Sequence, residues 1–196
     1  MGVHDSPSGV RTQPDTVLEF ARHLAETKFE DLPTAAIDAA KRSVIDTIGC
    51  MVAGSRSSSA LALLQVAKSW GGAPESTVWG HPERLPSYFA TMVNCGMVHQ
   101  HDFDDTHDKA ACHPTSASFN AAFSVAESIG NIDGRTLLTA VVLGTDLACR
   151  LGLALRGSVW DYPWVRAPVG GIFGAAAAAG KVYDLNAEGM HNALGL

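Results

Sequence analysis

The chain has 196 residues, of which 46% are hydrophobic, 17% charged and 7% aromatic. This length and composition exclude an intrinsically disordered segment and a very small protein that folds only with disulfides or bound metals. They predict a globular domain with a sizeable core. The formal net charge of −6 at pH 7 argues against binding to a phosphate backbone, so we expect no nucleic-acid partner.

The cysteines and the apolar runs indicate a soluble protein of a reducing compartment. The four cysteines lie far apart with no Cys-x-x-Cys pair, and we expect reduced thiols in a cytoplasmic protein. The first residues lack the apolar stretch of a signal peptide, and the longest uncharged apolar run, 167–180, is too short and too glycine-rich to cross a bilayer. We therefore expect no membrane partner. The cysteines are Cys50, Cys95, Cys112 and Cys149.

Helical periodicity begins early in the chain. Residues 1–14 are expected to form a flexible N-terminus, and a first helix follows Asp15, a favourable N-cap residue. A second helix is expected to open at Asp31, with Pro33 in its first turn, and to close at Gly54 in the C′ position.

The rest of the chain is predicted to be helical too. Strand-like alternation is scarce, and 76–79 is predicted to be a connector because no patterned strand lies nearby. The helix expected at 169–183 consists mostly of glycine and alanine, so it can be stable only if neighbouring helices pack closely against its backbone. We therefore expect it at the centre of the domain. The fold class is therefore all-α, a packed multi-helix domain over 15–196. The further helices are expected after the turn 57–59 as far as 70, from 86 into the segment 99–108, at 114–129, 133–155, 169–183 and from 186.

Four histidines and four aspartates fall between residues 99 and 113. If the helix from 86 continues through this segment, His99, Asp102 and Thr106 stand at positions i, i+3 and i+7 and share one face. Such a face, at the end of a helix, would direct several titratable side chains into one cleft.

A second feature adjoins this segment. His113 precedes the helix that starts at Pro114, where backbone N–H groups, the positive end of the helix dipole and the hydroxyls of Thr115 and Ser116 face outward. This corner is suited to bind a carboxylate beside a titratable imidazole.

Four interpretations of these residues remain open. His113 and an aspartate suit general acid/base chemistry at a carbon next to a carboxylate, because imidazole titrates near neutral pH. The cluster within 99–113 would also suit zinc or iron in a metal-dependent hydrolase, although its spacing matches no specific ligand motif. Cys112 beside His113 is a candidate nucleophile and base. In the fourth interpretation the segment is only a solvated loop that precedes a helix.

Several stretches together resemble the MmgE/PrpD family, which includes 2-methylcitrate dehydratase, cis-aconitate decarboxylase and iminodisuccinate epimerase. They are spread over the chain, and only their combination is specific. They read IDTIGC at 45–50, HDFDDT at 101–106, HPT at 113–115, AE at 126–127, GTD at 144–146, RL at 150–151 and FGAAAAAGK at 173–181.

The resemblance implies a large helical domain, usually a homodimer, with an α/β lid domain inserted before the chain returns to the helices. It also implies a lyase or isomerase acting on small di- or tricarboxylic acids with no metal and no cofactor. The family's active-site positions fall on Asp102, Thr106 and His113 of this chain. With His113 and Asp102 as the catalytic pair, we expect Thr106, Thr115 and Arg166 to bind substrate carboxylates.

Two departures from the family pattern stand out. The loop between Thr106 and His113 is one residue longer, and 164–166 reads Trp-Val-Arg where many members have a histidine. Arg166 would bind a carboxylate in its place, through its bidentate guanidinium. Family members are also roughly twice as long, so the lid domain is expected to be missing from this helical domain. The alternative is a non-catalytic helical subunit or interaction module that needs a partner chain, so we expect a homodimer or a heteromer with a chain that supplies the lid.

Overall fold

The computed structural model describes residues 15–155, 158–161 and 163–195. The expected flexible N-terminus, residues 1–14, lies outside the described residues. As predicted, the described chain is all-α apart from one pair of two-residue strands. Its elements are α1 Thr16–Glu26, η1 Phe29–Asp31, α2 Thr34–Gly54, α3 Ser58–Trp70, β1 Ser76–Thr77, β2 Arg84–Leu85, α4 Ser87–Val98, η2 His99–His101, α5 Pro114–Ile129, α6 Gly134–Ala154, η3 Val159–Asp161, α7 Arg166–Val182 and α8 Ala187–Gly195.

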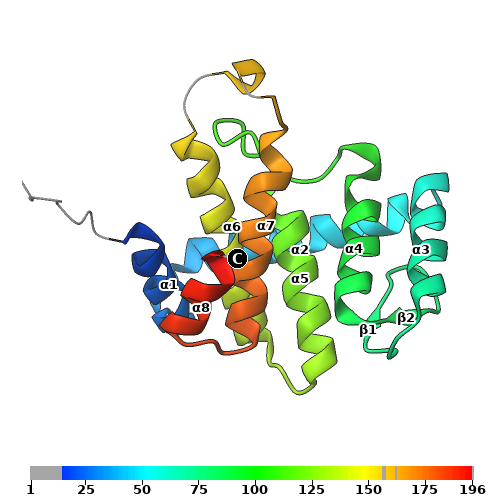
Figure 1. The fold of residues 1–196 in the computed structure, drawn as a ribbon, viewed down its shortest axis with the longest axis horizontal. Helices are drawn as coiled ribbons and strands as arrows, with labels where there is room; N and C mark the ends of the chain where they lie inside the picture. The colour runs from blue at the N-terminus through cyan, green and yellow to red at the C-terminus, as the bar shows by residue number, and fades with distance from the viewer. Residues whose placement is uncertain (1–14, 156–157, 162, 196) are drawn as a thin grey trace, which may run out of the picture.

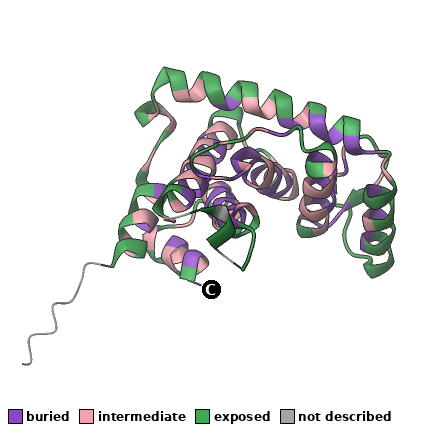
Figure 2. Ribbon diagram, turned by 90° about the horizontal axis from the view of Figure 1, so that it is seen from above, coloured by how far each residue is buried: buried purple, intermediate pink, exposed green. Residues whose placement is uncertain are grey.

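The helices α5, α6 and α7 pack against one another at the centre of the molecule (Figure 1). On one side α4 packs against α5 and α3 against α4, and on the other α8 packs against α1 and α7. Helix α2 runs across this row and contacts α4, α5 and α6, and its outward side is largely exposed (Figure 2). The last turn of α4 and the first turns of α5 and α7 lie at the same end of the molecule (Figure 1).

The central position expected for the Gly/Ala-rich helix is confirmed, because α7 packs on both α5 and α6. A Cβ atom placed on Gly144 of α6 would lie 2.5 Å from the carbonyl oxygen of Gly174, and one on Gly174 would lie 2.8 Å from the carbonyl oxygen of Gly144. The two backbones therefore approach each other closely only because neither residue has a side chain.

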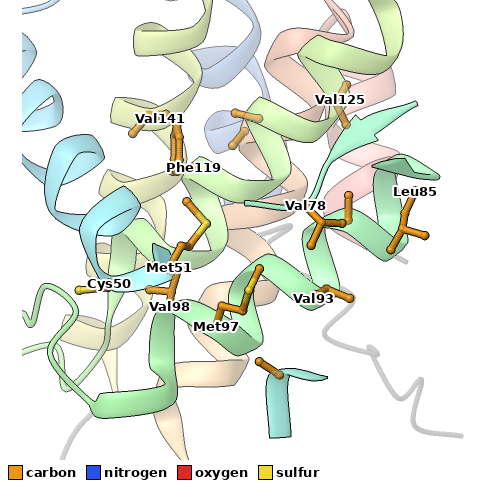
Figure 3. Close-up of a cluster of buried hydrophobic side chains, with 14 of the residues drawn as sticks. Cys50, Met51, Val78, Leu85, Val93, Met97, Val98, Phe119, Val125 and Val141 are labelled. Atoms are coloured by element: carbon orange, nitrogen blue, oxygen red, sulfur yellow. The ribbon is translucent and has the colours of Figure 1, made fainter. Parts of the chain in front are cut away.

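Apolar side chains form two buried clusters. The larger one joins the helices from α2 to α7, and within it Met51, Met97 and Phe119 are each at most 1% exposed (Figure 3). The smaller cluster joins α1, α6, α7 and α8. Helix α6 is the one described helix that is long and apolar enough to cross a membrane, and its contacts with both clusters are typical of a core helix. The smaller cluster consists of Ala21, Leu24, Leu143, Leu147, Ala177, Met190 and Leu194.

Several predicted helix ends are confirmed, and side chains cap the starts of α1 and α6, whereas α7 begins at Arg166, three residues before the expected start. The Asp15 carboxylate accepts hydrogen bonds from the backbone N–H groups of Val17 and Leu18. Asp133 accepts from the N–H of Thr136 at the start of α6. Helix α5 spans 114–129 as expected, and it ends at Gly130, whose φ of +75° suits glycine.

The two predicted ends of α2 are wrong. Its N-cap is Pro33, while the Asp31 carboxylate accepts from the backbone N–H of Lys28 within η1. Gly54 is the last helical residue and is followed by Ser55 in a right-handed conformation, not the left-handed turn expected. Gly54 is needed for a different reason, because a Cβ atom there would collide with the carbonyl oxygen of Met97 on α4.

The segment 76–79 was expected to be a connector, and this is also wrong in part. Ser76 and Thr77 form β1, which pairs antiparallel with β2. The Glu127 carboxylate on α5 accepts from both the backbone N–H and the hydroxyl of Thr77, at 2.6 and 2.8 Å. A contact with a distant helix therefore stabilises a pair too short to leave a sequence pattern.

Candidate functional site

The segment between α4 and α5 carries the histidines and aspartates, and it does not continue the helix. Helix α4 ends at Val98, η2 adds one tight turn, and Asp102 then adopts the left-handed conformation with φ of 55° and ψ of 36°. The expected shared helix face of His99, Asp102 and Thr106 is therefore wrong. Aspartate tolerates this conformation better than most residues, and the reversal brings the side chains together in another way.

Four side chains, which we call the His/Asp cluster, converge after this reversal: His99, Asp102, Asp104 and His113. Oδ1 of Asp104 lies 3.1 Å from Nδ1 of His99 and 3.7 Å from Nδ1 of His113. Oδ1 of Asp102 lies 3.6 Å from Nε2 of His113. The side chain of Asp104 is 1% exposed and that of Asp102 75%, so one carboxylate is buried under the imidazoles and the other is at the surface.

His113 sits where α5 begins, immediately before Pro114 at the first helical position. Its Nδ1 faces inward, 3.3 Å from the hydroxyl of Thr106 and within reach of Asp104. Its ring is 4.8 Å from the ring of His99 in an edge-on arrangement. Because Nδ1 has partners within the fold, Nε2 is the nitrogen on the side of the exposed Asp102, where a ligand would reach it.

The carboxylate corner expected at the first turn of α5 is occupied by the chain itself. Asp105 accepts a hydrogen bond from the backbone N–H of Thr115 at 3.3 Å and another from its hydroxyl at 2.6 Å. Thr115 is 1% exposed. Burial raises the pKa of Asp105, the charges of Asp104 and Asp46 raise it further, and the hydrogen bonds from Thr115 oppose this shift.

Arg166 begins α7, at the same end of the molecule. Its side chain is buried, and Nη2 donates a hydrogen bond to the carbonyl oxygen of Ser158 at 3.0 Å. A Cβ atom on Gly171 would lie 3.5 Å from Ala117, so the N-terminal halves of α7 and α5 are neighbours. The structure thus places Arg166 near the segment 158–161, and among the predicted site residues it brings His113, Asp102 and Thr106 together.

An open cleft of about 990 Å³ lies beside the His/Asp cluster, between α2 and α6. His107 and Thr115 line it, but His113 and Asp102 do not. The cleft therefore reaches the segment 99–113 at His107 and not at the two residues of the proposed catalytic pair. Sequence reasoning missed this cleft, and it also missed the buried position of Asp104, because neither leaves a local pattern.

The His/Asp cluster has the composition of a metal site as well. One potential ligand atom from each of its four residues lies within 4.8 Å of the others. Imidazole nitrogens and carboxylate oxygens are ligands that zinc and iron accept. The geometry is therefore compatible both with proton transfer and with a bound divalent cation.

Comparison with known proteins identifies the class. The family model of the MmgE/PrpD N-terminal domain matches residues 18–196, and the chain belongs to the MmgE/PrpD family. It is 32% identical over 183 residues to a cis-aconitate decarboxylase from Homo sapiens, which covers 90% of this chain and 38% of that protein. It is 27% identical over 197 residues to one from Aspergillus terreus, which covers 98% of this chain and 39% of that protein. The chain thus spans about two fifths of the length of the curated relatives that it matches.

Proposed function

We propose that this chain is the helical, site-bearing part of an enzyme that acts on a small di- or tricarboxylic acid by metal-free acid/base proton transfer at carbon. The reaction would be a dehydration, a decarboxylation or an epimerisation. The proposal rests on the position of the His113 imidazole. Its Nδ1 atom contacts the Thr106 hydroxyl and the Asp104 carboxylate, and its Nε2 atom faces the exposed carboxylate of Asp102. The similarity to cis-aconitate decarboxylases supports a lyase.

In this proposal His113 gives or takes the proton at Nε2, and Asp102 orients that nitrogen or shares its proton. Thr106, Thr115 and Arg166 bind substrate carboxylates. For Thr115 this requires Asp105 to release the two hydrogen bonds that it now accepts. In a decarboxylation, the bond to the leaving carboxylate breaks, carbon dioxide departs, and the electron pair left on the substrate carbon takes the proton from His113. In a dehydration, His113 removes the proton from carbon, the C–O bond on the neighbouring carbon breaks as the double bond forms, and the hydroxyl group leaves as water with a proton from an acid of the complete site. In an epimerisation, His113 removes the proton from carbon and the carbanion takes a proton on its opposite face.

The relatives are longer than this chain, so the proposal includes an assembly. The working enzyme would be a homodimer, or a heteromer with a chain that supplies the lid domain, in the cytoplasm. It would bind no nucleic acid and no membrane.

Proton transfer at carbon can be tested directly in heavy water. The full-length enzyme, or the mixture of this chain with the polypeptide that completes it, is incubated with cis-aconitate and related di- and tricarboxylates, and deuterium entering substrate or product is followed by NMR. We expect His113→Ala to lower the rate by about 100-fold or more. His191→Ala is the matched control, because His191 contacts Asp15 away from the site. If the folded His113→Ala variant kept the wild-type rate, the proposed role of His113 in proton transfer would be rejected.

A metal-dependent hydrolase is a second candidate, favoured by the convergence of four ligand atoms in the His/Asp cluster. Elemental analysis of the purified protein, followed by titration of Zn²⁺ into dialysed protein, separates the two candidates. Stoichiometric zinc or iron that is lost in both His99→Ala and His113→Ala would favour the hydrolase. Full proton exchange in metal-free protein would favour acid/base catalysis.

A further inference from the structure

The outward side of α2 carries an apolar stripe that no other described part of the chain covers (Figure 2). Ile45 is 71% exposed and Val52 is 53% exposed. Ile45, the exposed Gly49 and Val52 stand at positions i, i+4 and i+7, so they share one face of the helix. Contiguous exposed apolar side chains are typical of an interaction surface. We call the outward face of residues 38–56 the α2 stripe.

The glycine at the middle of the α2 stripe is not explained by the chain itself. Gly49 lies within α2, in a backbone conformation that any residue adopts. A Cβ atom placed on it would meet nothing of the described chain within 4 Å. Glycine also destabilises the interior of a helix relative to alanine. A glycine that neither the backbone nor a described neighbour requires points to the close approach of another molecule.

Charges of opposite sign continue the α2 stripe at its two ends. Asp38 lies seven residues before Ile45, and Arg56 lies four residues after Val52, in the turn that follows α2. Both are exposed, and Asp38 has only a surface contact with Lys41, at 3.7 Å. Steps of four and three residues alternate along this face, as they do along the contact line between two packed helices. The positions are 38, 42, 45, 49, 52 and 56.

The α2 stripe is complementary to itself when two copies run antiparallel. A twofold axis at the level of residue 47 places residue 45 across from residue 49 of the second copy, and residue 38 across from residue 56. The side chain of Ile45 would then fill the space that Gly49 leaves open, and Asp38 would face Arg56. Each contact would occur twice. A parallel pair would instead bring like charges together at both ends.

We propose that a second copy of this chain docks on the α2 stripe, and that the two α2 helices pack antiparallel about a twofold axis near residue 47. The inference rests on the homodimer of the proposed function and names the surface that forms it.

The proposed interface would border the segment that carries the His/Asp cluster. At the end of α2, the carbonyl oxygen of Ala53 lies 3.4 Å from Nε2 of His101. The ring of His101 is 5.9 Å from the ring of Phe103, which is 76% exposed. The exposed Phe103 ring would extend the apolar surface beyond the α2 stripe, toward the area of about 800 Å² on each partner that a specific interface buries.

Sedimentation velocity of the full-length enzyme over a range of concentrations gives the dissociation constant of the dimer. Ile45→Lys should raise it by about 30-fold or more, because a charge enters an apolar contact twice. The matched control is Ile172→Lys, since Ile172 on α7 is 68% exposed, and it should leave the constant unchanged. A monomeric wild-type enzyme, or a dimer that Ile172→Lys dissociates and Ile45→Lys does not, would overturn the proposal. So would an Ile45→Lys variant that unfolds more easily without dissociating, because a segment of the same polypeptide would then cover the α2 stripe.

Exchange of the two end charges tests the antiparallel arrangement. Asp38→Arg alone and Arg56→Asp alone should each raise the dissociation constant about tenfold, because like charges would face each other twice. The double variant carries opposite charges again and should return to within about threefold of wild type. Single variants that match wild type, or a double variant as weak as the single ones, would rule out this arrangement.

Gly49→Ala separates association from folding. In a sample dilute enough to be monomeric it should stabilise the chain, but it should raise the dissociation constant about fivefold or more, because each new methyl group would meet Ile45 of the second copy. Unchanged association in this variant would count against the close approach of the two helices.

The assembly and the chemistry fail separately. Deuterium that enters the substrate in a monomeric enzyme would reject the dimer and leave the acid/base function standing. A dimer that responds to these variants as expected, in an enzyme that transfers no proton, would reject the proposed function alone.

Discussion

The carboxylate of Asp105 accepts two hydrogen bonds from Thr115, one from its backbone N–H and one from its hydroxyl. An internal anion thus sits at the first turn of α5, where the backbone N–H groups and the helix dipole favour negative charge. This position was expected to take a carboxylate from the substrate. The chain supplies its own carboxylate instead, and that group is half-buried and close to Asp104.

The first prediction concerns the pH dependence of stability. The pKa of Asp105 in the folded chain is raised above its ordinary value of 3.8, so the folded state binds this proton more tightly than the unfolded state. The contribution of Asp105 to the free energy of unfolding should therefore fall as the pH rises from about 3.8 through the raised pKa. The Asp105→Asn variant has no proton to lose at this position. Its free energy of unfolding, measured relative to that of wild type, should therefore increase as the pH rises through this range.

Urea unfolding at a series of pH values measures this difference. Asp38→Asn is the control, because Asp38 is exposed and has only a surface contact with Lys41 at 3.7 Å. Its difference from wild type should stay nearly flat. If the free energy of unfolding of Asp105→Asn instead decreased relative to wild type with rising pH, the hydrogen bonds from Thr115 would affect the pKa of Asp105 more than burial does.

The second prediction concerns Asp104, the buried member of the His/Asp cluster. Its Oδ1 atom lies within reach of Nδ1 of both His99 and His113, and we expect it to be a positioning residue for the His113 ring. In the full-length enzyme, Asp104→Asn should lower kcat at least about tenfold, as a part of the general acid/base contribution, and should change KM much less. The control is Asp108→Asn, an exposed aspartate of the same loop. An equal change in both variants, or a loss confined to KM, would contradict this role.

The third prediction tests the close packing of α6 on α7. Gly144→Ala would place a Cβ atom 2.5 Å from the Gly174 carbonyl oxygen, and such overpacking should lower the free energy of unfolding by about 1–3 kcal/mol. Gly49→Ala in α2 meets nothing within 4 Å and should raise it by about 0.5–1 kcal/mol, because alanine is the better helix former. Chemical denaturation of both variants gives the comparison. If Gly144→Ala were as stable as Gly49→Ala, α6 and α7 could move apart at little cost, and the prediction of close packing would be wrong.

The helices could be predicted well where their signals are local. Helix α5 was expected at 114–129 because Pro114 opens it and Gly130 ends it, and both residues act within one turn of the chain. The continuation of α4 past His99 was predicted wrongly, because apolar periodicity carries no information about the reversal at Asp102.

The site could be predicted only in part, for a similar reason. Family resemblance pointed to Asp102, Thr106 and His113, and the structure does bring these residues together. The buried position of Asp104 depends on how the segment between α4 and α5 folds back, and the close approach of Ala110 to Gly152 depends on where α6 packs. Such relationships join elements that are far apart in the chain, so no local pattern reports them.

The contact of α2 with η2 anchors the turn that carries His99. The Ala53 carbonyl oxygen at the end of α2 lies 3.4 Å from Nε2 of His101, and Gly54 presses against Met97. These two contacts fix the position of the tight turn η2, from which His99 reaches the buried carboxylate of Asp104. A substitution that loosened the end of α2 would therefore displace an imidazole on a different element, without touching any of the four residues of the His/Asp cluster.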